Sequence, residues 1–212
     1  MRGFYRKKPD PGQIVQGSKV YLGEGKPECQ LMDEILFAAG RNPQTHVIFC
    51  FEGHGKLSTM LKLVGQKSQE LGALFVLLDA ETQGFQHRCR LVSRAVTDAR
   101  IFPTAVKGRP GIQTLGGKQF DFSVSPDNAN AGRIEDLILQ EIRNYVEWND
   151  IQQFSQSLNA HHAWAVDSKA LVQFFISARR PGMCGAASAF EAGILNYQDA
   201  AYNNIRNAVL AI

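Results

Sequence analysis

Short apolar segments alternate with amphipathic helical segments through the first half of the chain, and this alternation restricts the fold more than any other feature. The predicted elements are strands at 18–25, 45–53 and 73–81 and helices at 27–40, 56–72 and 86–100. The strands are apolar on both faces, which is typical of a parallel sheet covered by helices on both sides. We therefore expect an α/β protein with a mainly parallel sheet, although the pattern does not give the strand order.

The second half of the chain is predicted to be mostly helical. A stretch rich in glycine and proline at 102–118 is expected to be a long loop, and residues 119–128 form a fourth predicted strand. Residues 132–158 are strongly helical in pattern, and further helices follow. We expect three parts: a basic N-terminal arm at 1–17, an α/β core at 18–130, and a helical C-terminal extension at 131–212 that packs on the core.

Composition and charge exclude several classes of protein. The formal net charge of +3 is small for a general polyanion binder, and part of it lies in the N-terminal arm, at Arg2, Arg6, Lys7 and Lys8, which we expect to be a solvated tail. No segment approaches the ~20 apolar residues that cross a bilayer, and the N-terminus lacks the apolar core of a signal peptide. The four cysteines (Cys29, Cys50, Cys89 and Cys184) are widely spaced. They favour reduced thiols in a cytoplasmic protein over a disulfide framework or a zinc site.

Acidic residues stand at the carboxyl ends of two predicted strands. Glu24 follows the first strand, and Asp79 and Glu81 end the third. Functional groups of open α/β sheets gather at this edge, and adjacent parallel strands lie only ~4.8 Å apart. Carboxylates brought that close repel one another unless a proton or a cation compensates, and Mg²⁺ or Mn²⁺ is the natural partner. The alternative is that these acids cap the following helices or face water.

The same segments resemble the TOPRIM family. The stretch "VYLGEGKPE" (20–28) is similar to the first TOPRIM signature, an apolar strand followed by Glu-Gly and a further acid, and "FVLLDAETQG" (75–84) is similar to the second, Asp-x-Asp with a following glycine. Within TOPRIM proteins the chain is most similar to an uncharacterised bacterial family, which shares the turn "EGHGKL" (52–57) and the segment "SPDNANAGRIEDLIL" (125–139). The resemblance covers residues 18–180 and implies a TOPRIM-like, Rossmann-like α/β fold.

The resemblance also implies a Mg²⁺-dependent centre for phosphodiester chemistry, as in topoisomerases, primases and OLD-type nucleases. By position, Asp79 and Glu81 would hold the metal, Glu24 would be a general acid/base or a further ligand, and Glu28 a supporting acid. Glu28 and Glu81 stand where the family usually has aspartate. Each glutamate side chain is one methylene longer than aspartate. Because Mg²⁺ requires a strict octahedral geometry, the longer side chains can weaken metal binding.

Five further residues are weaker candidates. Asp127 and Glu135 are possible additional acids, although Glu135 also suits the positive end of a helix dipole. Three basic residues near the predicted crevice are candidate phosphate contacts: Lys26, Lys56 and Arg88.

Three hypotheses about function follow. The first is a cytoplasmic Mg²⁺-dependent nuclease that acts on nucleic acid with a partner ATPase, a partner implied only by the OLD-type relatives. The second is a TOPRIM-fold binding or regulatory subunit without catalysis, which the two glutamate replacements favour. The third is hydrolysis of a small phosphoester by the same acids. The tyrosines have no topoisomerase context and the cysteines form no primase-type zinc module. The sequence indicates no oligomeric state.

Overall fold

A computed structural model describes residues 3–6, 9–162, 166–183 and 185–212. Three residues of the expected basic arm (Arg2, Lys7 and Lys8) and one cysteine, Cys184, lie outside the described residues. Cys29, Cys50 and Cys89 are free thiols, and all three are buried.

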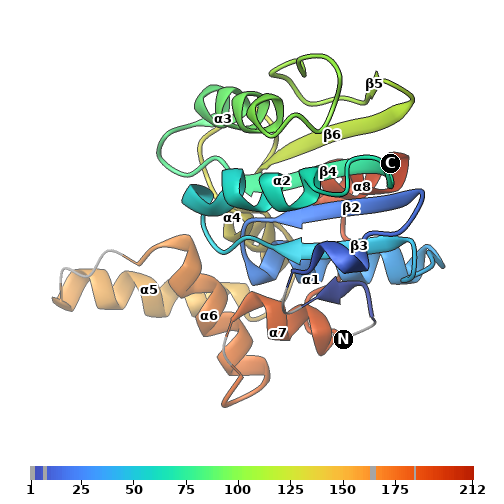
Figure 1. The fold of residues 1–212 in the computed structure, drawn as a ribbon. Coiled ribbons are helices and arrows are strands. Elements are labelled where there is room, and N and C mark those ends of the chain that lie inside the picture. Colours follow the sequence, from blue (N-terminus) through green and yellow to red (C-terminus); the bar gives the residue numbers. More distant parts are fainter. Residues whose placement is uncertain (1–2, 7–8, 163–165, 184) are drawn as a thin grey trace.

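The centre of the molecule is a six-stranded, mainly parallel sheet (Figure 1). The strands are β1 (Tyr5–Arg6), β2 (Ser18–Gly23), β3 (His46–Cys50), β4 (Leu71–Asp79), β5 (Gln113–Leu115) and β6 (Lys118–Ser125). They lie in the order β1-β3-β2-β4-β6-β5, and every neighbouring pair is parallel except β5 and β6. The expected α/β class with a mainly parallel sheet is confirmed.

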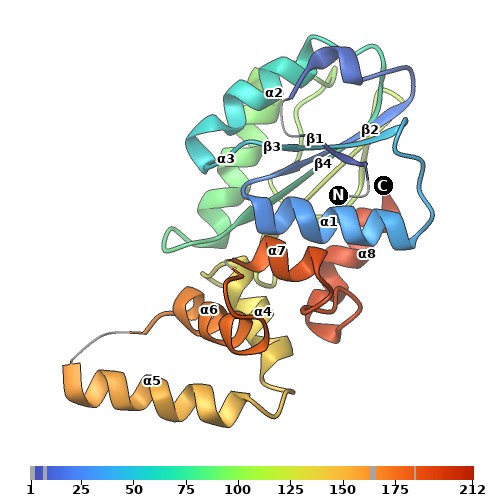
Figure 2. The ribbon, with the colours of Figure 1, turned by 90° about the horizontal axis from the view of Figure 1, so that it is seen from below.

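Helices cover both faces of the sheet. The helices of the described residues are α1 (Lys26–Ala38), α2 (Leu57–Gly65), α3 (Phe85–Asp98), α4 (Ile134–Ile142), α5 (Trp148–His162), α6 (Ser168–Arg179), α7 (Ala186–Glu191) and α8 (Asn203–Ala211). Figure 2 shows α2 and α3 on one side of the sheet and α1, α7 and α8 on the other. This is the layered, Rossmann-like arrangement that strands apolar on both faces require.

Alternation along the buried strands divides the core into two layers. On β2, Val20 and Leu22 pack toward α2 and α3, whereas Tyr21 packs toward α1 and the C-terminal helices. Because successive side chains of a strand point to opposite faces, each buried strand serves both layers. The strands are thus fixed on both sides, and their carboxyl ends form a rigid edge.

The N-terminal arm differs from the expected solvated tail where the structure describes it. Tyr5 and Arg6 form the edge strand β1 beside β3, and Phe4 is buried in the core. The buried carboxylate of Asp33 accepts hydrogen bonds of 3.2 Å from the main-chain N–H groups of Phe4 and Tyr5. The side-chain acceptor and the buried ring together hold a segment that its charges alone would leave in water.

Two other expectations need correction. The strongly helical stretch expected at 132–158 is interrupted between α4 and α5, where the Tyr145 hydroxyl donates a hydrogen bond of 3.0 Å to Glu141 and its ring packs on Phe175. The loop expected at 102–118 contains β5, which pairs with β6 through the turn at Gly116 and Gly117.

The C-terminal helices pack on the α/β core. Helices α7 and α8 contact α1, and α4 contacts α6. A buried carboxylate, Glu141, accepts hydrogen bonds from the Tyr202 hydroxyl (2.7 Å) and the Asn196 N–H (2.7 Å) as well as from Tyr145. No helix within the described residues has both the length and the apolar character needed to cross a membrane.

Candidate functional site

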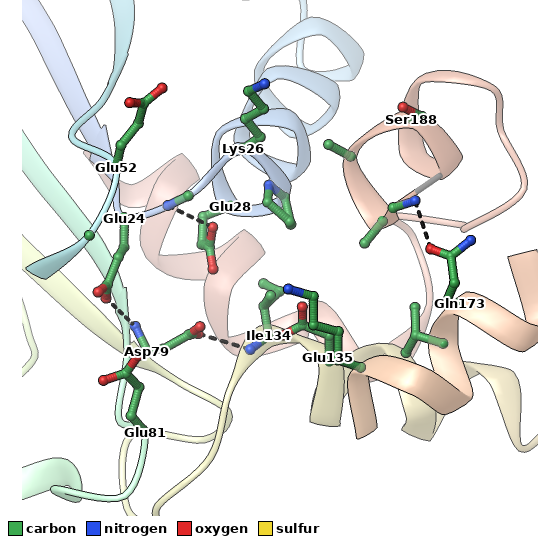
Figure 3. Close-up of a pocket in the computed structure, with 18 residues that line it drawn as sticks. Glu24, Lys26, Glu28, Glu52, Asp79, Glu81, Ile134, Glu135, Gln173 and Ser188 are labelled. Atoms are coloured by element: carbon green, nitrogen blue, oxygen red, sulfur yellow. Dashed lines mark hydrogen bonds between the residues drawn. The ribbon is translucent and has the colours of Figure 1, made fainter. Parts of the chain in front are cut away.

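Two of the predicted acids lie together at the ends of neighbouring strands. Strands β2 and β4 are paired in parallel, so Glu24, just after β2, lies beside Asp79, the last residue of β4. The Asp79 N–H donates a hydrogen bond of 3.1 Å to Oε2 of Glu24 (Figure 3). The sheet thus brings these two carboxylates to one point.

The carboxylate of Asp79 is held in a strongly acidic environment. Its Oδ1 accepts a hydrogen bond of 2.8 Å from the N–H of Ile134, at the start of α4. Burial, followed by the nearby charges of Glu28, Glu135 and Glu24, raises the pKa of Asp79 to about 9. The hydrogen bond from Ile134 acts in the opposite direction and does not offset these effects.

Glu28 is the second acid with a strongly raised pKa. It lies in the first turn of α1, where its Oε2 accepts a hydrogen bond of 2.9 Å from the Gly25 N–H. It is 2% exposed. Burial and the neighbouring carboxylates Glu135 and Glu24 raise the pKa of Glu28 to about 8. Glu28 therefore caps its helix and faces the other acids at the same time.

Glu81 is bound to a buried arginine. Arg88, on α3, is fully buried, and its Nη2 lies 2.5 Å from Oε2 of Glu81 and 4.0 Å from Oε1 of Glu24. Within the described part of the chain, Nε and Nη1 of Arg88 have no hydrogen-bond partner. Glu81 has a left-handed backbone (φ 48°), and its main chain forms an isolated bridge with Gly132. The side chain of Glu81 is therefore a partner of Arg88, and Arg88 is a buried counter-charge to both acids.

The acids line one wall of a pocket of about 680 Å³. On this wall lie Glu24, Glu28, Glu52, Asp79, Glu81 and Glu135. The opposite wall comes from α6, α7 and the turn before α7, and it contains Gln173 and Ser188 (Figure 3). Lys169, at the start of α6, also lines the pocket. Gln173 supports this wall, because its Oε1 accepts a hydrogen bond of 3.0 Å from the Gly185 N–H. The pattern of the sequence did not indicate these residues, since they follow the second motif by about 90 positions in ordinary helical segments.

Of four other predicted residues, two line the pocket and two do not. Glu135 and Lys26 line it, whereas Asp127 and Lys56 lie elsewhere. Asp127 is exposed and accepts hydrogen bonds from Ala129 and Asn130, which lower its pKa, so it stabilises its own turn. Lys56 is exposed and does not line the pocket, but it forms an ion pair of 3.7 Å with Glu52, which does.

The donor chemistry of this wall suits a hard cation, but the side chains are not closed around one point. Mg²⁺ and Mn²⁺ prefer carboxylate oxygens, and the raised pKa values of Asp79 and Glu28 reflect their burial together with the neighbouring carboxylates. Among the described residues, no three His, Cys, Asp or Glu side chains are arranged to hold a metal ion as they stand. The carboxylates would have to move toward one another to do so.

The fold and the pocket define an α/β protein with an acidic crevice at the carboxyl edge of a parallel sheet. A family model, described as protein of unknown function (DUF3226), matches residues 18–209. The chain belongs to the DUF3226 family. Neither the curated proteins nor the solved structures contain a significant match.

Proposed function

We propose that this protein is a TOPRIM-like, Mg²⁺-dependent phosphodiesterase that hydrolyses nucleic acid. The observation that carries the proposal is the pairing of Glu24 with Asp79 at adjacent strand ends, with Glu28 and Glu135 facing them. Such a group of carboxylates at the carboxyl edge of a parallel sheet is suited to a divalent cation and a phosphate ligand.

Asp79 and Glu28 are the residues proposed to hold the ion, with Glu135 as a further oxygen donor. When bound, Mg²⁺ would lower the pKa of a coordinated water and neutralise charge on the phosphate oxygens. Glu81 was expected to be a metal ligand, and its bond to Arg88 gives it a second proposed role. In that role Glu81 and the buried Arg88 fix the position of the strand end.

The remaining pocket residues have proposed roles that their chemistry supports. Lys26 and Lys169 line the pocket, and neither forms an ion pair with another described residue. Each amine is a point charge that can contact a phosphate oxygen of the substrate. Glu24 is the proposed base, because a carboxylate at hydrogen-bond reach of the attacking water can accept its proton.

A nuclease assay tests the proposal. Single- and double-stranded DNA and RNA are incubated with Mg²⁺ or Mn²⁺ and with the wild type, Asp79→Asn or Glu52→Gln. We expect metal-dependent cleavage by the wild type and by Glu52→Gln, whose side chain is exposed on the pocket rim and paired with Lys56. Asp79→Asn should lose at least about 100-fold in rate, as is usual when an essential charge-stabilising group is removed. Cleavage at the same rate in Asp79→Asn would contradict the proposal.

A second candidate is a TOPRIM-fold binding or regulatory subunit without catalysis. Glu81 favours it, because this carboxylate is bound to Arg88 instead of being directed at the other acids. Absence of cleavage with either metal, together with retained nucleic-acid binding, would support this candidate. Hydrolysis of bis(p-nitrophenyl) phosphate without cleavage of nucleic acid would instead point to a small phosphoester substrate. The partner ATPase stays a prediction from the resemblance to OLD-type relatives. The cytoplasmic location stays a prediction from the cysteine pattern.

A further inference from the structure

Basic residues are concentrated in one segment of the chain. Residues 89–118 contain six lysine and arginine residues and one acid, Asp98, whereas the whole chain contains 23 basic and 20 acidic residues. The segment comprises most of α3 and the connection that leads through β5 to β6. Its charge therefore belongs to one side of the sheet, the side that α2 and α3 cover (Figure 2).

Most basic residues of this segment lie on α3, just after it, or on the connection that packs against it. Arg90 and Arg94, one turn apart on α3, line a groove of about 450 Å³ with Ser58 of α2 and His87. The following connection packs back on α3, because the Ser93 hydroxyl donates a hydrogen bond of 2.9 Å to the Val106 carbonyl and Gly108 lies against Cys89 and Ser93. Lys107 and Arg109 flank Gly108, so they lie alongside the same helix. We call these residues the cationic face: Arg90, Arg94, Arg100, Lys107 and Arg109.

Most of the charge on the cationic face is uncompensated. All five side chains belong to exposed residues. Arg94 pairs with Asp98 at 3.7 Å, and the other four form no ion pair with a described residue. Arg90 donates a hydrogen bond of 3.3 Å to the Gln86 carbonyl. Because a carbonyl is neutral, this bond does not compensate the charge of Arg90. Five exposed cations with one neighbouring acid, Asp98, leave a net positive charge that attracts a polyanion.

We propose that the cationic face binds the sugar-phosphate backbone of a nucleic acid and leads it to the acidic pocket. Helix α3 has 14 residues, which gives a length of about 21 Å, enough to meet several successive phosphates. It begins at Phe85, four residues after Glu81 of the pocket wall. A nucleic acid that follows α3 therefore reaches the edge of the pocket.

The charge of the pocket explains why a separate binding surface is needed. Six acidic residues and two lysines line the pocket, and even with Asp79 and Glu28 protonated the acids outnumber the lysines, so without a metal the pocket is a poor site for a phosphate. Affinity for a polyanion must then come from cations outside the pocket, and such contacts are independent of sequence. The inference rests on the proposed function for its ligand class, but binding at the cationic face does not require catalysis.

The test measures binding of a fluorescent 20-base-pair DNA duplex by anisotropy, in EDTA, between 50 and 200 mM salt. The double variant Arg90→Gln/Arg109→Gln is compared with Arg143→Gln/Arg180→Gln, which removes two exposed cations at the C-terminal ends of α4 and α6, helices of the layer on the other face of the sheet (Figure 2). We expect Kd to rise at least about tenfold in the first variant and to change less than about twofold in the second. The salt dependence of log K should become shallower by about 2 in the first variant alone.

Three outcomes overturn the inference: equal loss in both double variants, no binding of DNA by the wild type, or tighter binding to phosphatidylserine vesicles than to DNA. Hydrolysis of bis(p-nitrophenyl) phosphate separates this inference from the proposed function. Its rate should be the same in Arg90→Gln/Arg109→Gln as in the wild type. Binding through the cationic face without any hydrolysis would support this inference and contradict the nuclease.

Discussion

The main-chain N–H of Asp79 donates a hydrogen bond of 3.1 Å to the carboxylate of Glu24, so the ends of β4 and β2 are joined where their acids meet. A main-chain donor cannot rotate away as a side chain can, and the sheet fixes both strands. The Glu24 carboxylate is therefore positioned by the fold itself. This explains how two acids 55 residues apart in the sequence come to line one pocket wall.

The pair formed by Arg88 and Glu81 gives a prediction about stability. Glu81→Gln leaves the fully buried guanidinium of Arg88 with Glu24 at 4.0 Å as its remaining acidic partner. We expect the free energy of unfolding to fall by about 3 kcal/mol, as when one partner of a buried ion pair is removed. Urea denaturation followed by circular dichroism measures it.

Two further variants control for this effect. Adding Arg88→Met to Glu81→Gln removes the unpaired charge and should restore at least half of the loss. Glu52→Gln removes an exposed ion pair and should cost less than about 1 kcal/mol. If the double variant is no more stable than Glu81→Gln, the pair is not the source of the effect.

The raised pKa values of Asp79 and Glu28 predict a stability that falls with rising pH. Their pKa values in the folded protein are about 9 and about 8, above the ordinary values of 3.8 and 4.5. Well below pH 3.8 both groups are protonated in the folded and the unfolded states, and no penalty arises. Between about pH 5 and 8 the unfolded chain has released these protons and the folded chain retains them. The free energy of unfolding then decreases by up to about 1.4 kcal/mol per pH unit for each group.

Denaturation in EDTA at pH 5, 6, 7 and 8 measures this slope. Asp79→Asn removes one of the two groups and should make the slope shallower. Saturating Mn²⁺ should flatten it further in the wild type, because a cation replaces the protons as the compensating charge. An identical slope in Asp79→Asn and wild type would show that Asp79 does not titrate in this range.

A substitution at Gly132, next to the site, is predicted to destabilise the fold. It has φ +147°, and a Cβ there would lie 2.7 Å from Oδ2 of Asp136 and 2.9 Å from Pro126. Its main chain also pairs with that of Glu81. We expect Gly132→Ala to lower the free energy of unfolding by about 2–3 kcal/mol, because strain and overlap combine.

Gly182→Ala is the matched control. Gly182 also has a positive φ (+84°), but a Cβ added there would meet no described atom within 4 Å. The substitution should cost about 1 kcal/mol, the effect of the backbone conformation alone. Equal losses in the two variants, measured by urea denaturation, would show that the contacts with Asp136 and Pro126 do not matter.

The α/β class and the position of Glu24 and Asp79 were predictable because both depend on local patterns. Buried strands read as apolar runs, and residues that follow them must lie at one edge of a parallel sheet. The hairpin of β5 and β6 had a usable signal in the Gly116–Gly117 pair, which permits the positive φ values of its turn. The pair did not stand out, because the whole segment 102–118 is rich in glycine and proline, a composition that indicates a loop.

Other features depend on contacts between distant segments and leave no local pattern. Arg88 looks like any arginine of an amphipathic helix, yet it is fully buried because Glu81 and Glu24 lie next to it in space. Lys169 reaches the pocket because α6 and α7 pack beside the strand ends. The burial of Phe4 depends on β3 and on Asp33, which lie 29 or more residues away. The spacing of residues along the chain does not predict these contacts.

Isothermal titration calorimetry with Mn²⁺ tests most directly the central claim that the carboxylates form a divalent-cation site. It compares the wild type, Asp79→Asn, Glu28→Gln and the control Glu52→Gln at pH 8. We predict saturable binding by the wild type and by Glu52→Gln, at least about tenfold weaker binding by Glu28→Gln, and none by Asp79→Asn. Absence of binding by the wild type, or equal binding by wild type and Asp79→Asn, would contradict the account.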